Sequence, residues 1–250
     1  NGYNSYFFSE LGVSVNSVET LVFYNKNASY EPSVLEKIKN AEVIFIAGGD
    51  QGLYYQYWNA TPLGDLLAQI ARNKDKVLGG TSAGMMVLGS MLYAPTGTGV
   101  ISDEALFNPY HFHMSELVFN HFIQIPLLHN MFFDTHFDDR NRTGRLMVFL
   151  ARAAAEKNTR ARAIACNEST VVCIDEKNIA TVFGDTPAYP DYAYFLEVNC
   201  EDDWKPQTVE AGKPVSWSPA GGNAVISQRL KGNRTGTNRF DLNTWKILVS

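Results

Sequence analysis

A short glycine-rich stretch, Gly-Thr-Ser-Ala-Gly at positions 80–84, offers the strongest chemical signal in the chain. It follows an apolar run and continues into a helix-like sequence. In hydrolases, a Gly-x-Ser-x-Gly pattern between a strand and a helix forms a nucleophile elbow, which exposes the serine hydroxyl to a base. Gly80 and Gly84 would avoid collisions in such a turn, and Ala83 would offer a backbone N–H to a developing oxyanion. Ser82 is therefore the candidate nucleophile, and the alternative is a serine that merely caps the helix.

A second apolar run, at residues 42–47, ends in Gly-Gly-Asp-Gln. Ligands in open α/β sheets gather outside the carboxyl ends of strands. We therefore expect the backbone amide of Gly49 to approach a substrate carbonyl and to form the oxyanion hole together with Ala83. Gln51 stands at the same edge as a polar substrate contact. The alternative is an ordinary turn in which Asp50 caps the next helix.

A third motif contains the candidate base. It is the sequence Asp-Thr-His-Phe-Asp-Asp-Arg-Asn-Arg-Thr-Gly-Arg-Leu at residues 134–146. His136 has a carboxylate two residues before it and three arginines after it, and a neighbouring carboxylate orients an imidazole for general-base work. The other histidines of the chain are expected to be core or surface residues without a catalytic role: His111, His113, His121 and His129.

The order and spacing of these three motifs, over about residues 40–175, resemble the cyanophycinase/aspartyl dipeptidase family of serine peptidases. The resemblance implies a fold similar to class I glutamine amidotransferases, with serine in place of their cysteine and a Ser-His-Glu triad. Cyanophycinases hydrolyse cyanophycin, a poly-aspartate whose side chains carry arginine, to β-aspartyl-arginine dipeptides. The resemblance also implies a homodimer.

Carried over by position, the resemblance assigns Ser82 as nucleophile and His136 as base. It favours Glu168 as the acid that orients His136, although the segment departs from the family pattern at Cys166 and Asn167. Asp134 is the competing acid, because it stands two residues before His136 in the sequence.

Five polar residues correspond to family pocket positions: Gln51, Asp134, Arg140, Arg142 and Arg145. A guanidinium grips a carboxylate with two hydrogen bonds, so at least one of these arginines is expected to bind the free α-carboxylate of an isoaspartyl substrate. Asp50 and Asp134 are candidate partners for the substrate's arginine. The alternative is that the arginines form surface ion pairs with Asp138 and Asp139. Thr135 stands where the family commonly has glutamine.

The motifs together predict a serine hydrolase that cleaves aspartyl or isoaspartyl peptide bonds through an acyl-enzyme, without a metal or an organic cofactor. Its partner would be a peptide with such linkages. The alternative is a catalytically silent secreted relative that serves as a binding or matrix protein. The presence of Ser82, His136 and Glu168 favours an active enzyme.

The hydrophobic pattern alternates between strands and helices in the first half of the chain. We expect strands at 18–24, 43–47 and 77–81, and helices at 32–40 and 53–73, the latter interrupted near Thr61 and Pro62. This predicts an α/β fold with a mostly parallel sheet flanked by helices. After a helix near 143–157, additional antiparallel strands are expected at 163–166, 170–175, 179–183, 192–198 and 223–227. Residues 1–250 are interpreted as a single catalytic domain, with 160–250 as its strand-rich extension.

Composition limits the classes of partner. The chain has 250 residues, 45% of them hydrophobic, and a net charge of −5 with scattered basic residues, which argues against nucleic acid. No segment has the ~20 uninterrupted apolar residues of a membrane span.

The beginning of the chain and its compartment complete the expectations. The resemblance predicts a strand and helix ahead of Asn1 that are cleaved or otherwise missing from this sequence. Cys166, Cys173 and Cys200 permit one internal disulfide. Acceptor-like Asn-x-Ser/Thr sequences occur at Asn27, Asn59, Asn141, Asn167 and Asn233. Together these features favour a secreted or extracellular protein, with a cytoplasmic location as the alternative.

Overall fold

The structure is a computed structural model that describes residues 2–10, 14–73, 75–95, 97–114, 116–185, 187–199, 202–219 and 222–248. Its helices are α1 (Gly2–Ser5), the π-helix η1 (Tyr6–Glu10), the 3₁₀ helix η2 (Lys26–Tyr30), α2 (Pro32–Asn40), α3 (Gln51–Trp58), α4 (Pro62–Ile70), α5 (Ala83–Met86), α6 (Ser102–Phe107), the 3₁₀ helices η3 (Phe112–Met114) and η4 (Pro126–Leu128), and α7 (Thr143–Lys157). Its strands are β1 (Val43–Ile46), β2 (Val77–Gly80), β3 (Leu92–Tyr93), β4 (Leu117–Val118), β5 (Met131–Asp134), β6 (Arg162–Cys166), β7 (Thr170–Ile174), β8 (Ile179–Gly184), β9 (Tyr192–Val198), β10 (Val225–Lys231), β11 (Asn238–Asp241) and β12 (Lys246–Leu248).

The strands form small sheets of different kinds. β1 and β2 make a parallel pair, and β3 and β4 make an antiparallel pair. A four-stranded sheet has the order β10-β9-β6-β5, in which β5 and β6 are parallel and the other neighbours antiparallel. The other four-stranded sheet, β12-β11-β8-β7, is antiparallel. The predicted α/β class is confirmed, but a mostly parallel sheet is not what the structure shows.

The missing strand at residues 18–24 accounts for part of this difference. Residues 18–24 form no strand, and Val22 and Tyr24 are 58% and 82% exposed, so β-prone residues there have no ladder partner. β6 pairs antiparallel with β9, as expected, and it also pairs in parallel with β5 after the crossover through α7. Among the described strands, the parallel ladders are therefore β1 with β2 and β5 with β6, in separate sheets.

Most other elements agree with the sequence pattern. The helix predicted at 32–40 is confirmed as α2. The predicted interruption near Thr61 is confirmed, because α3 ends at Trp58 and α4 begins at Pro62 with the Thr61 hydroxyl as its N-cap. This cap and the proline at the first helical position explain why a new helix begins there. The strand-rich C-terminal part is also confirmed, with β6 to β12 after α7.

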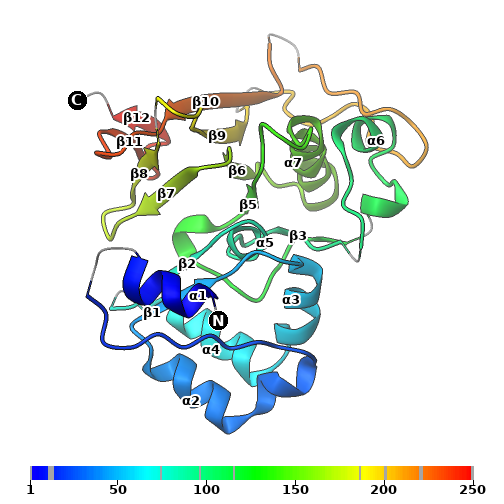
Figure 1. The fold of residues 1–250 in the computed structure, drawn as a ribbon. Coiled ribbons are helices and arrows are strands. Elements are labelled where there is room, and N and C mark those ends of the chain that lie inside the picture. Colours follow the sequence, from blue (N-terminus) through cyan, green and yellow to red (C-terminus); the bar gives the residue numbers. More distant parts are fainter. Residues whose placement is uncertain are drawn as a thin grey trace.

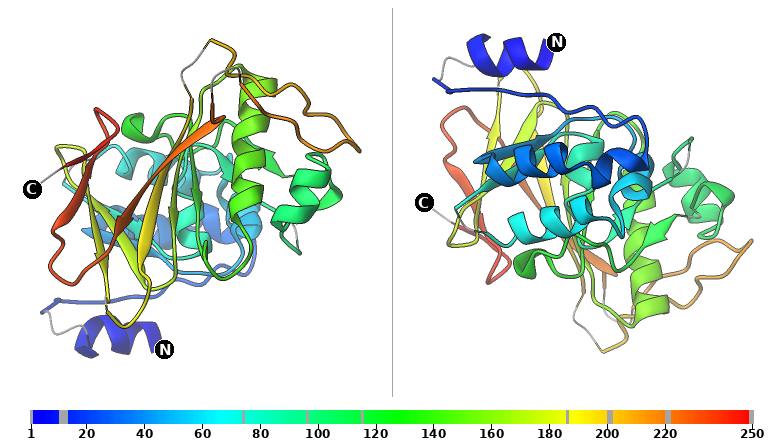
Figure 2. Two further views of the ribbon diagram at one scale, coloured as in Figure 1. Left: turned by 90° about the horizontal axis from the view of Figure 1, so that it is seen from above. Right: turned by 90° about the horizontal axis from the view of Figure 1, so that it is seen from below.

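The elements are arranged around α5. In Figure 1, α1 to α4 with β1 and β2 lie in the lower part of the view, the C-terminal strands lie in the upper part, and α5 lies between them. α7 runs alongside the strands of the β10-β9-β6-β5 sheet (Figure 2). One continuous cluster of buried hydrophobic side chains extends from α2 through α7 to β11. The residues that follow β2 and β5 therefore meet over a well-packed interior.

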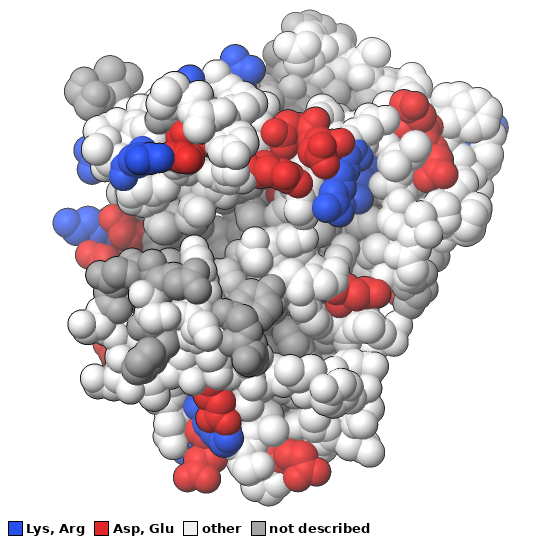
Figure 3. All heavy atoms as spheres, in the orientation of Figure 1, with Lys and Arg blue, Asp and Glu red and all other residues white. Residues whose placement is uncertain are grey.

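Charge and helix length add two observations. Lys and Arg side chains are scattered among Asp and Glu side chains on the face shown in Figure 3. Among the helices that the structure describes, none has both the length and the apolar character needed to cross a bilayer.

Candidate active site

Ser82 lies in a sharp turn between β2 and α5. Its backbone has φ 53° and ψ −122°, a conformation outside the regular regions that is typical of a nucleophile elbow. A side chain at Gly80 would overlap the Gly84 carbonyl, and one at Gly84 would overlap the Ile46 carbonyl, so both glycines are required. The Ser82 side chain makes no helix-cap hydrogen bond. The elbow geometry is therefore present, and the alternative of a capping serine is wrong.

His136 lies two residues beyond the end of β5, again with a positive φ of 50°. Its Nε2 is 2.8 Å from Ser82 Oγ, and its Nδ1 is 2.6 Å from Glu168 Oε1. A carboxylate accepts the Nδ1–H, which leaves Nε2 free to accept the serine proton. The structure thus brings Ser82, His136 and Glu168 into one line of hydrogen bonds.

The parallel pairing of β5 and β6 explains why Glu168 reaches His136. Asp134 is opposite Ala165 in this pair, so the residues just after both strands emerge side by side. The Glu168 N–H also donates to Asp138 Oδ1 at 3.2 Å. The hydrogen bond from His136 is the main cause of the lowered pKa of Glu168; desolvation opposes it, and the charges of His136, Arg140 and Arg142 lower the pKa further. Glu168 therefore remains a carboxylate at neutral pH.

Asp134 does not compete for His136, because its carboxylate is fully buried and already paired. Arg145 donates to it twice, from Nε to Oδ2 at 2.9 Å and from Nη2 to Oδ1 at 2.5 Å. Arg145 is itself 2% exposed and also donates to the Val100 carbonyl. The predicted substrate contacts of Asp134 and Arg145 are therefore corrected: the two residues form an ion pair in the interior, which holds β5 against α7.

The other two arginines differ from each other in burial. Arg142 Nη1 donates to the Thr135 carbonyl at 2.6 Å and lies 3.6 Å from Asp134 Oδ1. Burial and the neighbouring Arg145 lower the pKa of Arg142 to about 10, so its guanidinium is charged at neutral pH. The Arg140 side chain is half exposed and lies 3.9 Å from Asp139, as the surface ion-pair alternative predicted.

The strand end at residues 48–51 approaches the elbow closely. A Cβ at Gly48 would stand 3.2 Å from the Ser82 Cβ, and Gly49 has a φ of 153° with the Tyr54 hydroxyl beside it. No acceptor for the backbone N–H of Gly49 or of Ala83 is found among the described residues. These two N–H groups are the ones expected to form the oxyanion hole.

The two polar residues after Gly49 are already engaged. Asp50 Oδ1 accepts the N–H groups of Gly52 at 2.8 Å and Leu53 at 3.2 Å. The alternative that Asp50 caps the next helix is therefore confirmed. The expectation that Asp50 binds an arginine of the substrate is corrected, because its carboxylate serves as the helix cap. Gln51 Nε2 donates to the Tyr93 carbonyl at 3.2 Å. Gln51 is half buried, next to the residues that support Arg145.

Two residues near this site, Asp138 and Tyr93, were not predicted to have a functional role. Asp138 is exposed, lines a hollow of about 420 Å³ with Phe137 and Tyr194, and accepts the Glu168 N–H. Its position in the third motif was the available signal. Tyr93 is buried, and the Arg145 guanidinium lies 5.3 Å from its ring centre. No sequence signal distinguished Tyr93 from an ordinary core tyrosine.

Comparison with known proteins places the chain in a family. The model of peptidase family S51 matches residues 3–182, a range that includes Ser82, His136 and Glu168. The chain belongs to peptidase family S51. Similar curated proteins are the cyanophycinase of Trichormus variabilis, 27% identical over 144 residues, and that of Synechococcus elongatus, 27% identical over 135 residues.

These matches cover part of each protein. The first covers 58% of this chain and 44% of the Trichormus protein, and the second covers 54% and 38% respectively. The chain thus matches less than half the length of these relatives. The crystal structure of a peptidase from an acI-B1 Actinobacterium is 20% identical and covers 82% of this chain and 66% of that one, with a TM-score of 0.42.

Proposed function

We propose that this S51 protein is a serine peptidase that cleaves aspartyl or isoaspartyl peptide bonds, as a cyanophycinase-like exopeptidase acting on β-Asp-Arg units. The observation that carries the proposal is the line from Ser82 Oγ through His136 to Glu168, with separations of 2.8 and 2.6 Å. Such a line is what a serine needs in order to lose its proton as it attacks a carbonyl.

The proposed reaction has two halves. His136 Nε2 takes the Ser82 proton as Oγ bonds to the substrate carbonyl carbon, and the protonated imidazole then gives that proton to the leaving amine as the C–N bond breaks. Water, deprotonated by the same imidazole, attacks the acyl-enzyme and releases the acid product while the proton returns to Ser82. Glu168 holds the Nδ1–H throughout and stabilises the imidazolium that forms in each half.

Backbone amides would stabilise the negative charge that develops on the carbonyl oxygen. The N–H groups of Gly49 and Ala83 flank Ser82 and have no acceptor in the described part of the chain. Preorganised donors of this kind contribute about 3 kcal/mol each to transition-state stabilisation.

Arg142 is the arginine that we propose for the substrate α-carboxylate. Its guanidinium is charged, is anchored by Thr135 next to His136, and exposes 14% of its side chain. Asp134 and Arg145 act behind it as positioning residues, because their ion pair fixes the end of β5 that leads to His136.

For the arginine of the substrate we propose Asp138. Its exposed carboxylate lines the hollow beside the residues that follow His136, together with the rings of Phe137 and Tyr194. A carboxylate with adjacent aromatic faces suits a guanidinium, which pairs with the former and stacks on the latter. The curated relatives that the chain matches carry the name cyanophycinase, which supports an arginine-bearing substrate.

The test is a substrate panel assayed with the purified protein and its Ser82→Ala variant. The panel contains cyanophycin, β-Asp-Arg and its α-linked isomer, with products separated by chromatography. We expect the wild type to release β-Asp-Arg from cyanophycin and Ser82→Ala to release none. Equal or zero release by both folded proteins would instead favour the catalytically silent binding protein.

Assembly and location are further proposals. We propose a homodimer, which light scattering after size exclusion would test. We also propose secretion. Asn27 is exposed and would accept a glycan, whereas Asn167 is buried and donates to the Pro190 carbonyl, so it would not. The expected result is a glycosidase-sensitive mass shift that Asn27→Gln reduces. Cys200 lies outside the described residues, and Cys166 and Cys173 are free.

A further inference from the structure

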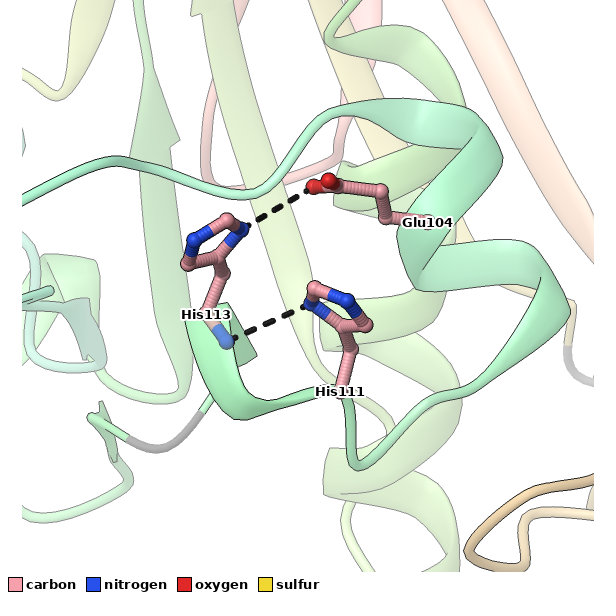
Figure 4. A group of neighbouring side chains, drawn as sticks. All are labelled: Glu104, His111 and His113. Carbon is pink, nitrogen blue, oxygen red and sulfur yellow. Dashed lines mark hydrogen bonds and ion pairs between the residues drawn. The ribbon is translucent and has the colours of Figure 1, made fainter.

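Two histidines and a glutamate that are not part of the proposed triad lie close to one another. Glu104 lies in α6, His111 directly precedes the 3₁₀ helix η3, and His113 lies within η3. Figure 4 shows the three side chains directed toward one another. One ligand atom of each residue lies within 4.8 Å of those of the other two, and all three residues are partly buried.

The spacing within this group suits a small cation. His113 Nδ1 is 3.2 Å from Glu104 Oε2. Ligands that surround Zn²⁺ tetrahedrally at ~2.0–2.1 Å stand about 3.3–3.4 Å apart, so this pair already has the required separation. Only His111 would have to approach, and it lies on the same short turn.

The turn that carries the two histidines is held in place by hydrogen bonds. The His113 N–H donates to His111 Nδ1 at 3.3 Å, and the Tyr93 hydroxyl donates to the His113 carbonyl at 2.6 Å. The same hydroxyl accepts the Val100 N–H at 2.7 Å. Backbone anchoring of this kind fixes the turn before an ion arrives, which lowers the cost of binding.

We propose that Glu104, His111 and His113 form a binding site for a divalent transition-metal ion of the Zn²⁺ class. Two imidazoles and one carboxylate are the donor set that such ions prefer, whereas Mg²⁺ and Ca²⁺ prefer all-oxygen sites. Three protein ligands leave a fourth position for water. This site takes no part in the proposed reaction, and its occupation would stabilise the turn that Tyr93 connects to Arg145.

The experiment measures Zn²⁺ binding calorimetrically on chelator-treated protein. Because His136 and Glu168 also present metal-ligand atoms, every protein in the series carries His136→Ala. We expect one ion per chain in this background, and at least a tenfold weaker apparent affinity in His111→Ala, in His113→Ala and in Glu104→Gln. His129→Ala, at an exposed histidine outside the group, should bind as the background protein does.

A second measurement separates lost ligands from lost folding. Circular dichroism of the zinc-free variants should match that of the background protein, and Co²⁺ should give tetrahedral d–d absorption bands only where all three ligands are present. Mg²⁺ should give neither heat nor stabilisation. The proposal is overturned if the background protein binds no Zn²⁺, or if folded variants lacking both imidazoles bind it with unchanged affinity.

Discussion

The proposed triad depends on one hydrogen bond that carries charge. Glu168 is an exposed carboxylate, and its pKa is lowered chiefly because it accepts the His136 Nδ1–H. The carboxylate is therefore present at neutral pH and is lost only when the pH falls through that lowered value.

Glu168→Gln tests this role. The amide keeps the size of the side chain but removes the charge that stabilises the imidazolium, so kcat should fall by about 10²- to 10⁴-fold. KM should change little, because Glu168 does not contact substrate. The measurement is the pH profile of kcat for both proteins. A variant with wild-type kcat would show that Glu168 does not orient the base.

Asp138→Asn tests the proposed contact with the substrate's arginine. The amide oxygen still accepts the Glu168 N–H, so only the charge that faces the hollow is removed. An exposed ion pair contributes up to about 1 kcal/mol, so KM for cyanophycin should rise about threefold to fivefold. KM for β-Asp-Ala should stay the same.

Asp139→Asn is the matched control for that experiment, since Asp139 pairs with Arg140 and does not line the hollow. An equal rise in KM for both peptides in Asp138→Asn would contradict a specific contact with arginine.

At the scale of elements, the elbow requires close contact between β2, α5 and β1. A methyl group at Gly84 would overlap the Ile46 carbonyl, and the backbone of β1 has no room to retreat without breaking its ladder with β2. Gly84→Ala should therefore lower the free energy of unfolding by about 3 kcal/mol in urea titrations.

Gly79→Ala provides the control for this prediction. It lies in the same strand, but a Cβ there would meet its nearest neighbour, the Phe45 ring, at 3.9 Å. Its free energy of unfolding should stay close to that of the wild type. Similar losses in the two variants would mean that crowding at the elbow is not the cause.

The elements also show what the sequence pattern was able to predict. Strong local signals succeeded: Thr61 and Pro62 marked a helix start, and the two glycines around Ser82 marked the elbow. The strand expected at 18–24 does not form. Alternating apolar residues favour an extended strand, but they do not provide a neighbouring strand for it to pair with. Sheet order depends on such partners, which lie far apart in the chain.

The same limit applies to the candidate site. The sequence identified Ser82 and His136 from their immediate neighbours, while the choice of Glu168 came from resemblance to a family. The pairing of Asp134 with Arg145 was not foreseen, because burial decides whether a charged residue faces a ligand or another charge. Local sequence carries little information about burial at the end of a strand.

At the scale of the whole molecule, one buried histidine should make stability depend on pH. Burial lowers the pKa of His121 from 6.5 to about 4. Its Nε2–H donates to the Val87 carbonyl at the end of α5. Unfolded chains take up a proton on this residue below pH 6.5, whereas the folded protein does so only near pH 4, so acid favours unfolding between these values.

The free energy of unfolding should therefore fall by roughly 3 kcal/mol from this group as the pH is lowered through that window. Denaturant titrations of His121→Phe should show a flatter pH dependence than the wild type. His129→Phe, at an exposed position, should keep the wild-type slope. Identical slopes in all three proteins would show that His121 is not the group responsible.

The most direct test of the proposed function is whether Ser82 is an activated nucleophile. The folded protein would be treated with an organophosphorus fluoride that phosphorylates activated serines, and the product would be analysed by intact mass and peptide mapping. We predict one adduct per chain on Ser82, with none in Ser82→Ala and strongly slowed labelling in His136→Ala. An unmodified Ser82 in the wild-type protein, or labelling that persists at full rate without His136, would contradict the account.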